Sequence, residues 1–246
     1  MIKIKSASEI EGIRKSCKLL KKMKDMLANH IAVGRRTSEL AELAEEFIYA
    51  NSAEPAFTQA GFPSCICVSV NDEVVHGIPG DYVLQEGDLV SIDMGLILDG
   101  YYSDMAISAV AGAASSEEQN LMDVTEESLK KGIEQFREGN HLGDISHAIA
   151  SFAEKNGFSV VRQFTGHGIG LELHEDPQIL NYGRPGTGPV LKNGMVFALE
   201  PMITAGSWEV GIDDNGWTAR TSDGSLSAHF EHTVALVDGV GGVLTA

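Results

Sequence analysis

The stretch "SIDMGLILDGYYSDMAISAV", residues 91–110, decides the fold of this chain, because it reads as two strands around a turn and yet holds two acids. Its isoleucine, leucine, valine and tyrosine residues are typical of strands that pack on a core. Asp93 and Asp104 interrupt those apolar runs. Burying a carboxylate without a partner is costly. The two aspartates therefore need one shared explanation.

The turn of this hairpin indicates how the two acids are arranged. The dipeptide Asp99-Gly100, set between apolar runs, is a strong signal for a two-residue turn. With that turn, the two aspartates point to one face as diagonal neighbours, roughly 7–8 Å apart at the backbone. Gly95 lies opposite Asp104 and leaves room for a cation. Converging carboxylates repel unless they are protonated or share a cation. The hairpin therefore predicts a metal site. The alternative is that either aspartate is a turn or edge residue that faces water.

The helices of the chain are predicted in two pairs. Apolar residues at helical spacing follow the capping pattern of Ser8 and Glu11, and again that of Ser115 and Glu118. A second helix follows the first from about Thr37, ending near residue 51, and its counterpart is predicted within residues 144–157. Strands are predicted after each pair: a hairpin turning at Asn71-Asp72, the hairpin of residues 88–112, and strands within 158–166, 194–201 and 226–237.

The order of elements therefore occurs twice. A shift of 105 residues superposes Gly34 on Gly139, Leu40 on Ile145, Phe47 on Phe152 and Asn51 on Asn156. The identity between the two segments is weak, but the repeated order of helix, helix and strands supports it. We expect an α/β (α+β) fold with two related halves, about 1–112 and 113–246, and a ligand cleft between them.

Composition and charge exclude several classes of protein. The 246 residues carry a formal net charge of -17, which argues against a DNA-binding surface because such surfaces cluster Lys and Arg. No long uncharged apolar run predicts a membrane span, and the first residues lack the apolar core of a secretory signal. Cys65 and Cys67 have poor disulfide spacing and Cys17 lies among the apolar residues of a predicted helix, so all three are expected to be reduced, as in the cytoplasm.

Three further residues complete a metal-binding pattern. Glu200 and Glu231 each stand in an otherwise apolar strand, where a charge is expensive. His167 lies in "FTGHGIG", between glycines that allow close backbone approach. Together with the two aspartates they form an oxygen-rich set with one imidazole. Such a set is suited to a pair of Mn, Fe, Co or Zn ions and is not a thiolate zinc site.

Two more histidines are candidates for chemistry. If the first hairpin turns at Asn71-Asp72, Cys67 faces His76 across the sheet and the pair forms a pocket wall. His174 follows His167 closely in the sequence. A purely structural role remains the alternative for each of these histidines.

The chain resembles the type I methionine aminopeptidases of peptidase family M24 along nearly its whole length. The matching stretches are "VVHGIPG", "SIDMG", "GYYSDMA", "FTGHGIGLELHEDP", "FALEPM" and "DNGWTARTSDGSLSAHFEHT". The resemblance implies the pita-bread fold in a single catalytic domain of residues 1–246. It also implies two divalent ions: Asp93 binds one, His167 and Glu200 bind the other, and Asp104 and Glu231 bridge both.

The same resemblance implies the reaction. Water activated by the metals attacks the first peptide bond, and Glu200 acts as general base and acid. His174 binds the scissile amide or the developing oxyanion, and His76 contacts the peptide near the scissile nitrogen. The methionine pocket is expected to use Phe62, Cys67 and Trp217. The chain departs from relatives at three positions expected to reshape this pocket: Ala56, Gln59 and Leu173.

The implied function is removal of the initiator methionine from nascent polypeptide N-termini when the second residue is small, by a cytoplasmic monomer that uses neither DNA nor a membrane. Contact with the ribosome exit region stays open. An X-Pro aminopeptidase or proline dipeptidase would use the same five ligands, although such enzymes usually carry a large N-terminal domain. A non-catalytic peptide-binding module would be expected to have lost ligands, and all five are present.

Overall fold

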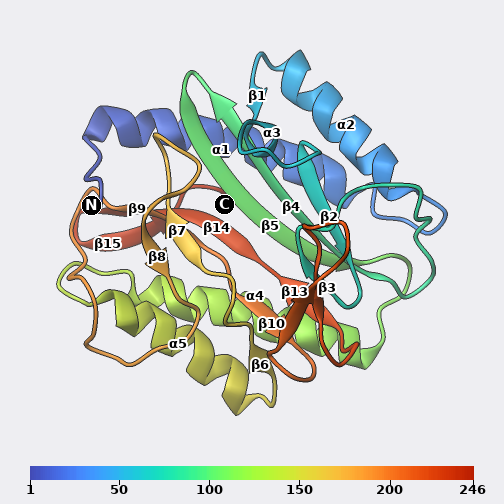
Figure 1. Ribbon diagram of the computed structural model, residues 1–246. Helices are drawn as coiled ribbons and strands as arrows, with labels where there is room; N and C mark the ends of the chain where they lie inside the picture. The colour runs from blue at the N-terminus through green and yellow to red at the C-terminus, as the bar shows by residue number, and fades with distance from the viewer.

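A curved antiparallel sheet runs through the centre of the molecule, and one pair of helices packs on each half of it (Figure 1). The computed structural model describes residues 1–246. One pair is α1 (Ala7–Ala28) and α2 (Thr37–Ala50), and the other is α4 (Ser116–Gln135) and α5 (Leu142–Lys155). A single turn, α3 (Ala56–Gln59), was not predicted. The predicted α/β organisation is confirmed, and no helix is both long and apolar enough to cross a membrane.

The capping boxes fix where two of the helices begin. The carboxylate of Glu118 accepts a hydrogen bond from Ser115 N at 2.6 Å, so α4 begins where the sequence predicted. For α1 the prediction is wrong by two residues, because Ser6 and Glu9 form the box instead of Ser8 and Glu11. The pattern Ser-x-x-Glu occurs twice at the start of this helix, and the structure uses the earlier of the two. Helix α1 ends at Ala28.

Positions that the 105-residue shift superposes adopt matching local structure. Gly34 and Gly139 both have left-handed backbone, with φ of 86° and 89°. Asn51 caps α2 and donates to Phe47 O at 2.8 Å, and Asn156 caps α5 in the same way, donating to Phe152 O at 2.8 Å. These equivalences support the proposal of two related halves.

All strand ladders are antiparallel, and the central sheet has nine strands. Its main path runs β1 (Glu54–Pro55), β4 (Leu89–Leu98), β5 (Tyr101–Val110), β14 (Glu231–Val237), β9 (Val196–Leu199), β7 (Gly166–Gly168) and β8 (Glu175–Ile179), with β2 (Ile66–Val70) on β4 and β15 (Val240–Val243) on β14. Two three-stranded sheets lie beside it, β13 (Ser227–His229) with β10 (Met202–Thr204) and β6 (Ser159–Val160), and β11 (Val210–Ile212) with β12 (Ala219–Thr221) and β3 (Glu73–Val75).

The predicted register of the β4–β5 hairpin is confirmed. Asp99 and Gly100 form its turn, and Gly95 pairs with Asp104. One detail is wrong. A Cβ at Gly95 would lie 2.9 Å from the Phe57 ring, so the space left by this glycine holds an aromatic side chain rather than a cation.

The hairpin predicted at Asn71-Asp72 does not form a ladder. Strand β2 pairs with β4, and β3 pairs with β12 in a different sheet. Asn71 does turn the chain, with a φ of 58°, and one hydrogen bond joins Val68 N to Gly77 O. The long apolar ladder available on β4 takes β2 into the central sheet, because that pairing buries both faces of the strand.

The two helix pairs bury separate cores against the sheet. Helices α1 and α2 pack on β2 and β4 through a cluster that includes Leu20, Leu40 and Ile92. Helices α4 and α5 pack on β9 and β14 through a second cluster that includes Leu129, Ile145 and Phe197. All three cysteines are buried and free, as expected. Both cores lie against the same face of the sheet and hold it rigid, which fixes the side chains that its strands carry.

Candidate metal centre

Five neighbouring strands of the central sheet each bring one predicted ligand to the same region. In the order of the sheet they are Asp93 on β4, Asp104 on β5, Glu231 on β14, Glu200 immediately after β9, and His167 on β7. These residues are far apart in the sequence, and only strand pairing makes them neighbours.

Strand register places three of the five on one face. Asp93 and Glu231 both pair with Ala106, from opposite sides of β5, so their side chains point the same way. Asp104 lies two residues from Ala106 and therefore shares that face.

The other two reach the same face through β9. Thr233, two residues after Glu231, pairs with Ala198, and Ala198 pairs on its other side with His167. Glu200 lies two residues beyond Ala198, just past the end of the strand. Alternation along each strand thus carries all five ligands to one side of the sheet.

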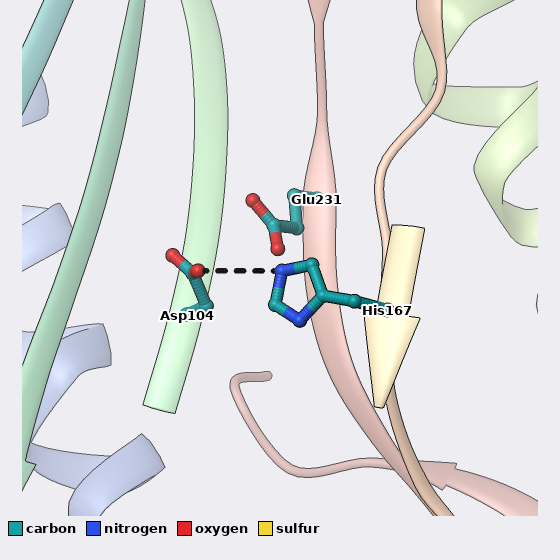
Figure 2. Close-up of side chains that lie close together, drawn as sticks. All are labelled: Asp104, His167 and Glu231. Atoms are coloured by element: carbon teal, nitrogen blue, oxygen red, sulfur yellow. Dashed lines mark ion pairs between the residues drawn. The ribbon is translucent and has the colours of Figure 1, made fainter. Parts of the chain in front are cut away.

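The side chains converge closely. Ligand atoms of Asp104, His167 and Glu231 all lie within 4.8 Å of one another, and Figure 2 shows the three pointing toward a common centre. His167 Nε2 lies 3.8 Å from Asp104 Oδ2 and 3.4 Å from Glu200 Oε1. Asp104 is 4% exposed and Glu231 2%. The group is buried as well as compact.

The donor atoms fit a cation. Asp93 Oδ1, Asp104 Oδ1 and Glu231 Oε1 are buried and have no hydrogen-bond partner. Buried polar atoms are rarely left unpaired, so three such oxygens from residues that line one cavity indicate a positively charged ligand. His167 Nδ1 lies 3.0 Å from Gly168 O. With Nδ1 donating to this carbonyl, Nε2 keeps its lone pair toward the carboxylates, as a metal ligand must.

Crowding changes the proton affinity of every group in the centre. Burial raises the pKa of Asp93 to about 7. Burial and the neighbouring carboxylates hold the pKa values of Asp104, Glu200 and Glu231 well above their usual range. Burial, with a smaller contribution from His174, lowers the pKa of His167 to about 3, so the imidazole is neutral. A divalent cation has the opposite effect, because it favours the ionised carboxylates and so lowers their pKa values.

The centre opens into a cavity of about 250 Å³ that has one acidic and one apolar wall. The cavity is lined by all ten residues that the sequence analysis gave a metal-binding, catalytic or methionine-pocket role: the five ligands, His76, His174, Phe62, Cys67 and Trp217. The ring of Phe62 packs edge-on against Trp217, with centroids 5.3 Å apart. His174 packs against His167 at 4.5 Å between ring centroids. The cavity therefore joins a candidate metal centre to an apolar slot.

Comparison with known proteins assigns this arrangement to a family. The profile of metallopeptidase family M24 matches residues 11–238. A methionine aminopeptidase from Clostridium perfringens is 48% identical over 246 residues, covering 100% of this chain and 99% of the relative. The chain belongs to metallopeptidase family M24.

Solved structures agree with that assignment. The crystal structure of methionine aminopeptidase from Rickettsia prowazekii superposes with a TM-score of 0.98 at 43% identity, and each chain is covered completely. The prolidase from Pyrococcus furiosus superposes with a TM-score of 0.81 at 27% identity, and only 65% of the prolidase is covered. This M24 peptidase therefore has the pita-bread fold, and its family implies divalent metal binding.

Sequence reasoning missed part of the pocket wall of this M24 peptidase. Phe57 and Ala60 line the cavity, and the apolar spacing around the short helix α3 was the available signal. Among the three departures from relatives, Leu173 lines the cavity. Gln59 instead bonds Glu54 at the surface, at 2.8 Å, and Ala56 is fully buried in the core. Of the three, only Leu173 is in direct contact with the cavity, so any effect of Gln59 or Ala56 on its shape is indirect.

Proposed function

We propose that this M24 peptidase removes the N-terminal methionine from nascent proteins and peptides whose second residue is small. The observation that carries the proposal is the single cavity in which five metal-ligand side chains face an apolar slot. The full-length similarity to methionine aminopeptidases supports the same activity.

The cavity has enough ligands for two divalent ions, drawn from Co, Mn, Fe or Zn. Asp93 would hold one ion and His167 with Glu200 the other, while Asp104 and Glu231 would bridge the two. Such ions lower the pKa of bound water and polarise a carbonyl oxygen. The unpartnered oxygens of Asp93, Asp104 and Glu231 are the structural support for these roles.

The remaining polar residues of the cavity would handle the proton and the substrate. Burial beside Asp93 and Asp104 raises the pKa of Glu200, which suits a carboxyl that accepts a proton from water and returns it to the leaving nitrogen. His174 would donate a hydrogen bond to the oxyanion, and His76 would contact the peptide near the scissile nitrogen. Burial lowers the pKa values of both histidines, so each is a neutral donor at neutral pH.

The apolar slot suits an unbranched side chain. Phe62, Cys67 and Trp217 form its wall, with Leu173 and Phe57 beside them. Methionine is flexible and fills irregular slots, and burying its side chain contributes roughly 1.5–3 kcal/mol. The thioether would lie against the edge-on pair of Phe62 and Trp217.

The setting of the activity belongs to the same proposal. Residues 1–246 would act as a single catalytic domain whose halves meet at the metal centre. We expect a monomer that meets nascent chains in the cytoplasm, with docking near the ribosome exit as a further possibility to test. Matching caps at Asn51 and Asn156 support the division into halves.

A substrate panel tests the proposal. Protein stripped with EDTA and reloaded separately with Co, Mn, Fe or Zn is assayed on Met-Ala-Ser, Met-Ile-Ser and Ala-Pro. We expect metal-dependent release of methionine from Met-Ala-Ser, slow release from Met-Ile-Ser and no cleavage of Ala-Pro. Preferred cleavage of Ala-Pro would reassign the chain to the prolidase type. Peptide binding without cleavage under every metal would indicate a binding module.

A further inference from the structure

A buried ion pair lies directly behind the loop that carries His174. Lys5 Nζ is 2.5 Å from Glu175 Oε2, and the two side chains are 1% and 0% exposed. Burial lowers the pKa of Lys5, while the hydrogen bond to Glu175 opposes that shift. Fully buried ion pairs are expensive to form and are weak sources of stability. This pair therefore needs an explanation other than stability.

The second oxygen of Glu175 organises the loop between β7 and β8. Glu175 Oε1 accepts hydrogen bonds from Leu171 N at 2.8 Å and Glu172 N at 3.2 Å. Its backbone pairs with Gly168, the residue next to His167. Glu175 thus joins Lys5 to the middle of the loop through its carboxylate, and to β7 through its backbone.

The N-terminal segment is itself firmly placed. Lys5 N donates to Gly194 O at 2.8 Å, and a Cβ at Gly194 would lie 2.8 Å from Lys5 O, so the two backbones are in direct contact. Figure 1 shows the N-terminus beside β9, the strand that pairs with β7. A second, more exposed ion pair joins Lys3 to Glu172 of the same loop at 3.0 Å. The loop is therefore held from outside the cavity by residues that do not line it.

We propose that Lys5 and Glu175 are positioning residues, which hold the 169–174 loop so that the His174 ring faces the scissile peptide bond. The inference rests on the role proposed above for His174. Removing the charge of Lys5 loosens the loop, and a displacement of about 1 Å at a reacting group lowers turnover by about 10- to 100-fold. Four of the five ligands and the Phe62, Cys67 and Trp217 wall lie on other elements, and His167 stays paired to β9, so we expect metal binding and substrate binding to change little.

The test compares Lys5→Met with the matched control Lys3→Met, which removes the exposed pair with Glu172 and only a 4.0 Å contact with Glu175 Oε1. For Lys5→Met we expect kcat on Met-Ala-Ser to fall about 10- to 100-fold, with KM within about threefold of wild type and full metal content. Lys3→Met stays within about twofold, because exposed pairs contribute little. Lys5→Arg restores most of the activity.

A background carrying His174→Ala separates positioning from general damage. If Lys5 acts through His174, Lys5→Met causes no further loss in that background, since residues acting as a unit are non-additive. An equal loss in both backgrounds overturns the proposal. So does a Lys5→Met variant with wild-type kcat.

Hydrogen exchange gives a readout that does not depend on activity. The amides of Leu171 and Glu172 should exchange about tenfold faster in Lys5→Met than in wild type. Unchanged exchange would contradict the positioning role, whereas an inactive wild-type enzyme would contradict only the proposed function. If Lys5→Met fails to fold, the double variant Lys5→Met/Glu175→Gln leaves no unpaired buried charge and serves for the same measurements.

Discussion

Asp104 is the residue on which the metal centre most depends. It lies within reach of both His167 and Glu231, and one of its oxygens has no other partner. We predict that Asp104→Asn lowers kcat/KM by at least about 100-fold, because even outer partners of metal ligands cost 10- to 100-fold. Metal analysis of the same protein should show reduced occupancy. Asp88→Asn is the control, since Asp88 is about as buried and hydrogen-bonded outside the cavity. Full metal occupancy with normal turnover in Asp104→Asn would remove this residue from the site.

The two tryptophans of the chain offer a matched pair for testing the apolar slot. Trp217 lines the cavity, whereas Trp208 packs on Arg162, 4.6 Å from the ring centroid to the guanidinium carbon. We predict that Trp217→Ala raises KM for Met-Ala-Ser about tenfold, in line with losing roughly 1.5 kcal/mol of contact. Steady-state kinetics of Trp208→Ala should match wild type. Equal effects of the two substitutions would place the methionine side chain elsewhere.

At the scale of elements, the segment around His76 lies against strand β2 so closely that there is no room for a side chain on the residue that follows it. Gly77 packs so closely that an added Cβ would lie 2.2 Å from Val68 O. We predict that Gly77→Ala destabilises the fold by about 1–3 kcal/mol and lowers kcat/KM by displacing His76. Urea unfolding and kinetics measure the two effects. Gly80→Ala is the control, because its Cβ would meet only Ile78 O, at 3.9 Å. A Gly77→Ala variant as stable and active as this control would refute the argument from close packing.

At the scale of the whole molecule, the metal centre links stability to pH. The pKa of Asp93 is raised to about 7 and those of Asp104 and Glu231 lie well above their usual range. A carboxyl with a raised folded pKa stabilises metal-free protein fully below the unfolded pKa of about 4, and that contribution is lost as pH rises through the folded pKa. Metal binding must displace these protons, so metal affinity changes in the opposite direction. His167 releases no proton on metal binding above about pH 4, because its pKa is about 3 and the ring is already neutral.

We therefore predict that divalent metal raises the Tm more at about pH 8 than at about pH 6, and that binding releases protons. Titration calorimetry of EDTA-stripped protein in two buffers with different ionisation enthalpies measures the release directly. The variant Asp93→Asn should release fewer protons than wild type. Equal Tm shifts at both pH values, with no buffer dependence of the heat, would show that the carboxyls are already ionised before the metal binds.

The sequence by itself determined the features that depend on local rules. Turn chemistry at Asp99-Gly100 set the register that pairs Gly95 with Asp104, and the capping box at Ser115 set the start of α4. The costliness of charges in apolar strands singled out Glu200 and Glu231, which the fold then brings to the same cavity. Each of these rules involves residues within about ten positions of one another, so it can be applied to the sequence without the tertiary structure.

Only the tertiary structure decided which segments meet. Local signals predicted β2 and β3 as a hairpin, but long-range pairing with β4 and β12 took the two strands into different sheets. No local pattern could indicate that Phe57 occupies the space beside Gly95, or that Lys5 lies buried against Glu175. The five ligands likewise meet only through the pairing of five strands that are distant in sequence. Contacts of this kind depend on the relative placement of whole elements, which is fixed by the packing of the helices on the sheet and not by any short stretch of residues.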